Sequence, residues 1–183
     1  MMNWSKHFDY DPISGNLLIK ARPREDFKRL ADWASRNARV AGKVSGAKGF
    51  RADGRPKSIR SWVNYKKYAN HFNIWEMNHG PVPAGLWVDH VNGNPFDNRL
   101  SNLRLATPSQ NNMNAGMQKN KRVKLAGVRR TREGWTTSIM AGGIRYPLGS
   151  HRTKGEAAVV YAKASLRYHG AFSPFMRKTI ASQ

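Results

Sequence analysis

An aspartate–histidine pair followed by two asparagines carries the side chains best suited to phosphodiester chemistry. Asp89 and His90 are adjacent, and Asn102 and Asn111 follow His90 by 12 and 21 residues. A histidine with an ordinary pKa of about 6.5 is neutral at physiological pH and can take a proton from water, so we predict that His90 is a general base. Carboxylate and amide oxygens suit hard cations, and we predict that Asp89 and Asn111 bind one Mg²⁺ or Mn²⁺ ion.

The remaining asparagines of this region have supporting or alternative roles. We expect Asn102 to bond the backbone of the preceding loop and to hold His90 in orientation. Asn112 and Asn114 are alternatives to Asn111 as the amide ligand. The competing interpretation is that Asp89 and His90 lie idle on a surface turn and that the asparagines only form loops.

Three short elements must position these side chains. Residues 86–92 (LWVDHVN) and 102–107 (NLRLAT) have the pattern of short strands, and the turn-forming sequence GNPFDNR lies between them. A helix is predicted to begin directly afterwards, with Thr107 as N-cap, Pro108 at the first helical position and Gln110 three residues after the cap. The strand pair would therefore present Asp89 and His90 beside a helix that carries Asn111.

Residues 79–114 resemble the HNH endonuclease family, in particular its small homing type from phages and introns. The pair Asp89-His90, the segment 102–104 (NLR) and the segment 109–111 (SQN) carry the resemblance, which extends over most of residues 8–114. It implies a ββα-metal fold that cuts double-stranded DNA with one divalent ion. The family name has histidine at its last position, where this chain has Asn111, and related homing enzymes also use asparagine there.

The chain before residue 86 is predicted to form a hairpin, a short amphipathic turn and a strand that runs into a helix. Residues 8–20 place a turn between two apolar runs, and Leu30 and Trp33 mark the amphipathic turn. Residues 60–79 have near-helical spacing of large apolar residues. We expect three of them to be core residues: Trp62, Phe72 and Trp75. His71 and His79 are expected to be structural, with phosphate contact as the alternative.

The composition points to a nucleic-acid partner. The chain has 32 Lys and Arg against 11 Asp and Glu, a net charge of +21, and 39% hydrophobic residues, enough for a core. It has no cysteine, which excludes disulfides, Cys-ligated zinc and a thiol nucleophile. We find no run of about 18 apolar residues and no secretory signal, and we expect no membrane association. The expected location is the cytoplasm of a phage-infected bacterial host, as a monomer with no evident protein partner.

The positive charge is uneven, and this predicts a domain boundary. Residues 1–117 hold 18 cations and 9 acids, whereas residues 118–183 hold 14 cations and 2 acids. We therefore predict a nuclease domain over 1–117, a basic linker over 118–125 and a second domain over 126–183, the alternative being a loop within one domain. The linker cations expected to contact DNA phosphates are Lys119, Lys121, Arg122 and Lys124.

Residues 127–172 resemble the DNA-binding domain of plant ethylene-response factors. The segment 127–129 (GVR), Trp135, the pair Leu148-Gly149 and the segment 156–158 (EAA) carry the resemblance. It implies a three-stranded sheet in the DNA major groove, backed by one helix. Met140 and Pro147 depart from the plant pattern, so its target sequence does not transfer.

Strand alternation in this domain selects the arginines that face DNA. Trp135, Thr137 and Ile139 are predicted to face the helix, as are Ile144, Tyr146 and Leu148 on the next strand, which leaves Arg145 outward. Arg129 and Arg145 are the best candidates for guanine contacts, because a guanidinium group can bond O6 and N7 together. Arg130 and Arg132 could read bases or bind phosphate, and phosphate contact is the alternative for all four.

The sequence thus predicts an α+β protein with a ββα-metal nuclease module and a small sheet–helix DNA-binding domain. The predicted function is site-specific DNA cleavage by a homing endonuclease, with nicking of one strand as the simpler outcome for one site per chain. The alternative is a non-catalytic DNA-binding regulator with a degenerate HNH scaffold.

Overall fold

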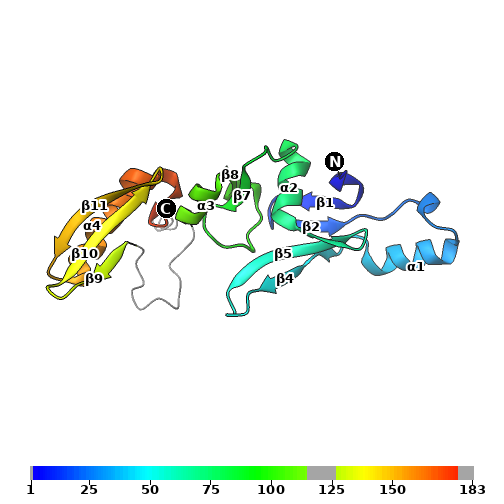
Figure 1. Ribbon diagram of the computed structural model, residues 1–183. Helices are drawn as coiled ribbons and strands as arrows, with labels where there is room; N and C mark the ends of the chain where they lie inside the picture. Colours follow the sequence, from blue (N-terminus) through cyan, green and yellow to red (C-terminus); the bar gives the residue numbers. More distant parts are fainter. Residues whose placement is uncertain (1, 115–126, 177–183) are drawn as a thin grey trace. The chain divides into compact units, whose positions relative to one another are not determined.

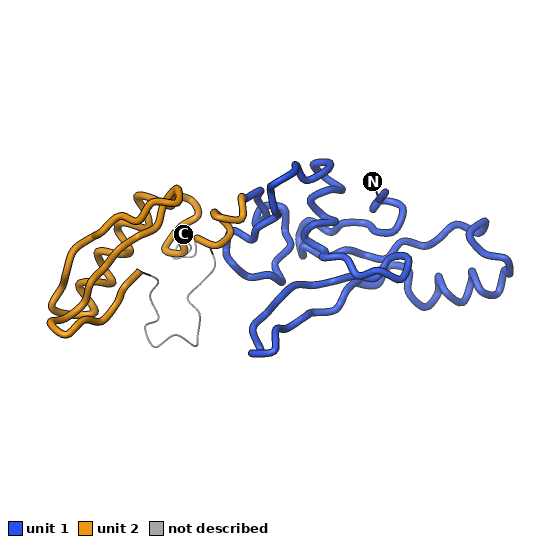
Figure 2. The backbone as a smooth tube through the Cα atoms, in the orientation of Figure 1, with its two compact units in different colours: residues 1–106 blue, residues 107–183 orange. Residues whose placement is uncertain are grey.

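The computed structural model describes residues 2–114 and 127–176 and divides the chain into two compact units (Figure 2). The first unit comprises Met1–Ala106 and the second Thr107–Gln183. Both contain helices and strands, consistent with the predicted α+β class (Figure 1). In the described residues no helix has both the length and the apolar character needed to cross a membrane.

The first sheet of the first unit contains the predicted hairpin. Strands β1 (Phe8–Asp11) and β2 (Asn16–Ile19) pair antiparallel, and β3 (Val44–Ser45) adds to β2. Between β2 and β3 the chain forms the short 3₁₀ helix η2 (Arg24–Asp26) and α1 (Leu30–Val40). This 11-residue helix is longer than the single turn that the sequence suggested.

The second sheet leads directly into the helix that packs on it. Its antiparallel strands are β4 (Ala47–Phe50), β5 (Pro56–Val63) and β6 (Lys66–Ala69), and α2 (Asn70–His79) follows without a loop. The prediction that Trp62 and Phe72 are core residues is wrong, because their exposed fractions are 63% and 37%. Trp62 lies on the outer face of β5, where alternation buries its neighbours instead. Trp75 packs against the core as predicted.

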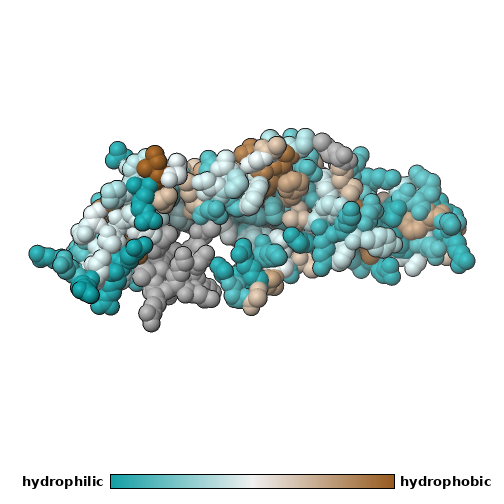
Figure 3. Space-filling model, viewed as in Figure 1, coloured by the Kyte–Doolittle hydropathy of each residue, from teal (hydrophilic) through white to brown (hydrophobic). Residues whose placement is uncertain are grey.

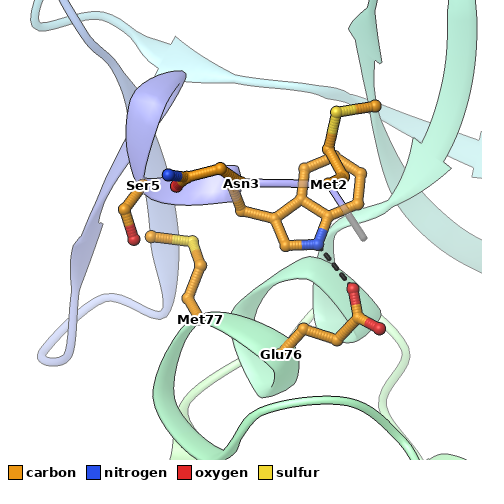
Figure 4. A pocket seen from close by; sticks show the side chains of 6 residues that line it. Met2, Asn3, Ser5, Glu76 and Met77 are labelled. Carbon is orange, nitrogen blue, oxygen red and sulfur yellow. Dashed lines mark hydrogen bonds between the residues drawn. The ribbon is translucent and has the colours of Figure 1, made fainter.

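One apolar core joins the first sheet, α2 and the strand pair that carries Asp89. Its seven buried residues are Trp4, Phe8, Leu17, Val63, Ile74, Val88 and Leu103. Each fully buried aliphatic side chain of this kind contributes about 1.5–3 kcal/mol. The N-terminal 3₁₀ helix η1 (Trp4–Lys6) is tied to α2, since Trp4 Nε1 donates a hydrogen bond to Glu76 Oε2 at 2.6 Å beside a cavity of about 290 Å³ (Figure 4).

A buried polar network fixes the start of α2 against two strands. The hydroxyls of Ser45 and Ser61 lie 2.8 Å apart, and Ser61 also donates to Asn70 Oδ1 at 2.8 Å. Asn70 Nδ2 in turn donates to the Ser45 carbonyl at 3.0 Å. Each member therefore has a partner although all three are buried.

The predicted strand pair forms the end of the first unit. Strand β7 (Trp87–His90) pairs antiparallel with β8 (Leu103–Ala106), so that Asp89 lies opposite Arg104 and His90 opposite Leu103. The intervening loop ends in the 3₁₀ helix η3 (Leu100–Asn102).

The second unit begins with the predicted capped helix. In α3 (Pro108–Asn114) the Thr107 hydroxyl accepts from Gln110 N at 3.2 Å, and Gln110 Oε1 accepts from Thr107 N at 2.8 Å, which confirms the capping box.

The sheet and helix expected after residue 126 are also present. Strands β9 (Val128–Arg130), β10 (Trp135–Ala141) and β11 (Ile144–His151) form an antiparallel sheet with β10 in the centre. Helix α4 (Lys154–His169) packs on all three strands. Thr153 is its N-cap, and the Thr153 hydroxyl accepts a hydrogen bond from Glu156 N. The 3₁₀ helix η4 (Gly170–Phe172) follows. Thr137 and Ile139 are buried as predicted, but Ile144 is 58% exposed because it lies at the β10–β11 turn, beyond the end of the core.

Candidate active site

Asp89 and His90 are buried neighbours on β7, with exposed fractions of 6% and 8%. Because side chains alternate along a strand, they point to opposite faces of the pair. Asp89 forms an ion pair with Arg104 on β8, whose Nε and Nη2 lie 3.0 and 2.9 Å from Asp89 Oδ2. A surface turn with idle side chains is therefore not what the structure shows.

The His90 ring is held by a residue that the sequence analysis did not select. His90 Nε2 lies 3.0 Å from Asn98 Oδ1. An amide oxygen only accepts, so Nε2 carries the hydrogen in neutral His90 and Nδ1 has the lone pair. Burial lowers the pKa of His90, while the Asn98 bond and the charge of Asp89 oppose that shift. His90 is therefore neutral at physiological pH, with the basic lone pair on Nδ1.

Asn102 bonds the loop before it, as predicted. Its Oδ1 accepts from the Asn92 backbone N at 2.9 Å, and its Nδ2 donates to Asn92 Oδ1 at 3.0 Å and to the Asp97 carbonyl at 2.8 Å. It thus closes the loop that carries Asn98. The His90 ring donates to Asn98, and Asn102 supports this bond by holding the loop that carries Asn98.

The first hairpin supports the same loop from outside. The Leu100 backbone N donates to Tyr10 Oη at 2.9 Å. Gly15, with φ of +72°, lies so close that a Cβ there would be 2.6 Å from Arg99 N. Asn98 itself is fully buried. Its signal in the sequence was weak, because asparagine in a turn-rich segment is ordinarily a turn former.

His71 on α2 contacts the predicted general base. The His71 and His90 rings meet edge to face, with centroids 4.9 Å apart. Burial, followed by the nearby His90 and Arg60, lowers the pKa of His71 to about 3. His71 is therefore a neutral ring against His90, in line with the structural role expected for it.

The third predicted site residue belongs to the other unit. Asn111 lies on α3, as do Asn112 and Asn114, and all three follow β8 within eight residues. Among residues 2–114 and 127–176, no group of three His, Cys, Asp or Glu side chains could hold a metal ion. The predicted ligand pair, the Asp89 carboxylate and the Asn111 amide, is not a group of this kind. It therefore stays a prediction.

The predicted DNA-contacting arginines are exposed where the structure describes them. Arg129 and Arg130 lie on β9, Arg132 in the following turn and Arg145 on β11. Arg145 pairs with Met140 and Arg129 with Thr136, on the face opposite to the buried Thr137 and Ile139. The linker cations Lys119, Lys121, Arg122 and Lys124 lie outside the described residues, as does the predicted boundary at 117/118.

Comparison with known proteins identifies a family for part of the chain. Residues 68–113, from β6 to α3, match the HNH endonuclease family. Protein 3.8 of Escherichia phage T7 is 34% identical over 113 residues, which are 61% of this chain and 93% of that protein. Residues 68–113 are therefore an HNH endonuclease domain. Such a domain indicates a nuclease that acts on DNA, and the family generally uses a divalent metal.

Two further relatives match about half of this chain. An uncharacterized HNH endonuclease, L560, of Acanthamoeba polyphaga mimivirus is 35% identical over 95 residues, 51% of this chain and 49% of that protein. Protein 7.7 of Escherichia phage T7 is 34% identical over 97 residues, 53% of this chain and 71% of that protein. No solved structure matches the chain.

Proposed function

We propose that this HNH protein hydrolyses DNA phosphodiester bonds with His90 as general base and one divalent ion bound by Asp89 and Asn111. The observation that carries the proposal is the bond between His90 Nε2 and Asn98 Oδ1, which leaves Nδ1 as the basic nitrogen of a neutral, buried histidine.

The side chains fit a hard divalent cation. The Asp89 carboxylate and the Asn111 amide offer oxygen donors, which suit Mg²⁺ or Mn²⁺ better than zinc. When bound, such an ion neutralises charge on the phosphate and stabilises the leaving oxygen. Asn112 or Asn114 could replace Asn111 as the amide donor.

The protein's own residues divide the remaining work. His90 Nδ1 takes the proton of the attacking water. Asn98 fixes the tautomer and the ring orientation, and Asn102 holds the loop that carries Asn98. His71 covers the ring and excludes water from that side.

We further propose that cleavage is site-specific, as in a homing endonuclease, and that the β9–β11 sheet reads the site. Arg129 and Arg145 on its outer face would contact bases. The phosphates would be contacted by Arg130, Arg132 and the linker cations. The resemblance to ethylene-response-factor domains supports this division. The phage relatives support an origin in a phage, and we propose that the protein acts as a monomer in the infected host.

Plasmid cleavage tests the catalytic proposal. Supercoiled plasmid should be converted to the open circle with Mg²⁺ and not with EDTA, and His90→Ala should lose this conversion while binding DNA normally. Conversion by His90→Ala at the wild-type rate would remove His90 from the mechanism.

One observation favours the non-catalytic alternative. Asp89 is already paired with Arg104, as expected of a scaffold carboxylate. A regulator of this kind would bind DNA but leave plasmid intact with Mg²⁺ or Mn²⁺, so the same assay separates the two functions.

A further inference from the structure

The β4–β6 sheet carries most of the net charge of the first unit. Residues 43–69 contain eight Lys and Arg and one acid, whereas the other 79 residues of the unit contain ten cations and eight acids. Asp53, the single acid, is paired with Arg55. The surface over the β4–β5 hairpin is correspondingly hydrophilic in Figure 3. This sheet is therefore the strongly electropositive part of the nuclease module.

The other cations of the sheet have no carboxylate to neutralise them. Within the part of the chain that the structure describes, Lys57, Arg60, Lys66 and Lys67 form no ion pair. Lys67 instead lies over the exposed ring of Trp62, with Nζ 4.8 Å from the ring centroid. Unpaired cations among exposed aromatic rings are typical of surfaces that bind nucleic acid.

The turn between β5 and β6 holds an aromatic residue in a costly conformation. Val63 pairs with Lys66, so Asn64 and Tyr65 form a two-residue turn, with φ of +47° and +63°. Such turns favour asparagine and then glycine, because a bulky side chain is disfavoured at positive φ. Tyr65 nevertheless occupies the glycine position, and its side chain is 98% exposed. No packing within the unit compensates for this strain.

The β4–β6 sheet is joined to the candidate active site at two places, through β6 and through β4. Tyr65 precedes His71, which contacts His90, by six residues, and β6 runs into α2 without a loop. On the other side, Phe50 of β4 packs edge to face on Phe96 of the active-site loop, with centroids 5.5 Å apart, and Lys48 Nζ lies 5.3 Å from the Phe96 ring. A four-residue strand spans about 13 Å, so the turn lies about one strand length from the start of α2.

We propose that the β5–β6 hairpin contacts the duplex substrate directly, with Tyr65 entering a groove to pack against bases and with Lys66 and Lys67 holding the flanking phosphates. The proposal rests on DNA being the substrate. The nuclease module would then bind DNA independently of the β9–β11 sheet. The contact also explains why the strained Tyr65 is present although the fold does not need it.

The test is DNA binding by the full-length chain in EDTA, where metal-dependent cleavage does not interfere. The probe is a fluorescein-labelled duplex of mixed sequence. Tyr65→Gly should weaken binding roughly 5- to 150-fold, the loss of one base–aromatic contact, and should raise the melting temperature because glycine relieves the strain. Tyr65→Phe should keep the affinity. Ile13→Gly, which removes an 87% exposed apolar side chain from the β1–β2 turn, is the matched control and should bind normally.

The lysines are tested by the salt dependence of the same binding. Lys66→Gln with Lys67→Gln should lower the slope of log Kd against log salt by about 1.8, whereas Lys28→Gln with Arg29→Gln should leave it unchanged. Wild-type affinity in Tyr65→Gly, or equal losses in the two charge pairs, would overturn the proposal. Because cleavage is not measured, a wild-type chain that binds but never nicks would refute the proposed catalysis and leave this inference standing.

Discussion

Arg104 donates a hydrogen bond from Nε to Asp89 Oδ2 across the β7–β8 pair, and its Nη2 lies 2.9 Å from the same oxygen. Both side chains are largely buried, so the carboxylate is held in place by the strand opposite to it. A cation bound by Asp89 has to share this carboxylate with Arg104. The ion pair therefore positions the proposed metal ligand and competes with the metal.

Replacing Arg104 should expose this competition. Arg104→Met leaves a buried carboxylate without its cation, and the free energy of unfolding should fall by about 3 kcal/mol. Added Mg²⁺ should then raise the melting temperature more in Arg104→Met than in the wild type. Thermal denaturation with and without Mg²⁺ measures both effects. Equal shifts in the two proteins would show that Asp89 does not bind the ion.

His90→Ala should lower the turnover number by roughly 10²- to 10⁴-fold while leaving DNA affinity near the wild-type value, because only the general base is lost. Asp89→Ala should abolish the metal-dependent cleavage. Single-turnover cleavage and binding in EDTA give the two quantities separately. Ser14→Ala, on the exposed β1–β2 turn, serves as the unaffected control.

Asn98→Ala should lower the turnover number about 10- to 100-fold, as expected for loss of a residue that orients a catalytic side chain. The ring would lose the bond that fixes its tautomer. Asn94→Ala, in the same loop but exposed, should have little effect on the chemical step. A normal rate in Asn98→Ala would show that the His90 tautomer is set by other contacts.

His71 should make the first unit sensitive to acid. Its pKa is about 3 in the folded state and about 6.5 when unfolded, so the unfolded chain takes up the proton first as the pH falls. The stability is complete above pH 6.5 and is lost progressively toward pH 3, by on the order of 3–5 kcal/mol. In urea titrations at several pH values, His71→Phe should flatten this dependence. An unchanged profile would mean that His71 titrates normally in the folded protein.

Replacing a base-reading arginine and replacing phosphate-binding cations should affect DNA affinity differently: only the first loss should depend on the DNA sequence. Arg145→Ala should cost roughly 1–3 kcal/mol on the cognate duplex and much less on scrambled DNA. Neutralising Lys119, Lys121, Arg122 and Lys124 should weaken binding to all sequences and flatten the salt dependence. Equal losses on both duplexes for Arg145→Ala would make Arg129 the next candidate.

The sequence predicted the parts of the fold that are specified locally. The caps at Thr107 and Thr153, the hairpin over residues 8–20 and the strands around Asp89 follow from turn and capping residues close in sequence. The helical spacing around Trp62 was misleading, because the turn at Asn64 and Tyr65 changes the period within that segment.

The site was predicted only in part for a related reason. His90 and Asp89 are recognisable by residue type, and Asn102 by its motif. The contacts that set their chemistry come from residues without such a signal: Asn98 from a loop, His71 from a helix 19 residues earlier and Arg104 from the opposite strand. These partners depend on strand register and tertiary packing, which spacing along the chain does not reveal.

The Ser45–Ser61–Asn70 network has a consequence for the uniqueness of the fold. A slip of β5 by one residue would turn Trp62 inward and Ser61 outward. The slipped chain would then bury Asn70 and Ser45 without Ser61, at a cost of about 1–3 kcal/mol for each orphaned group. Misregistered forms of the hairpin are thereby selected against during folding. A mutation such as Ser61→Val would therefore leave the residues of the turn at Asn64 and Tyr65 unchanged yet allow a second, competing hairpin to accumulate.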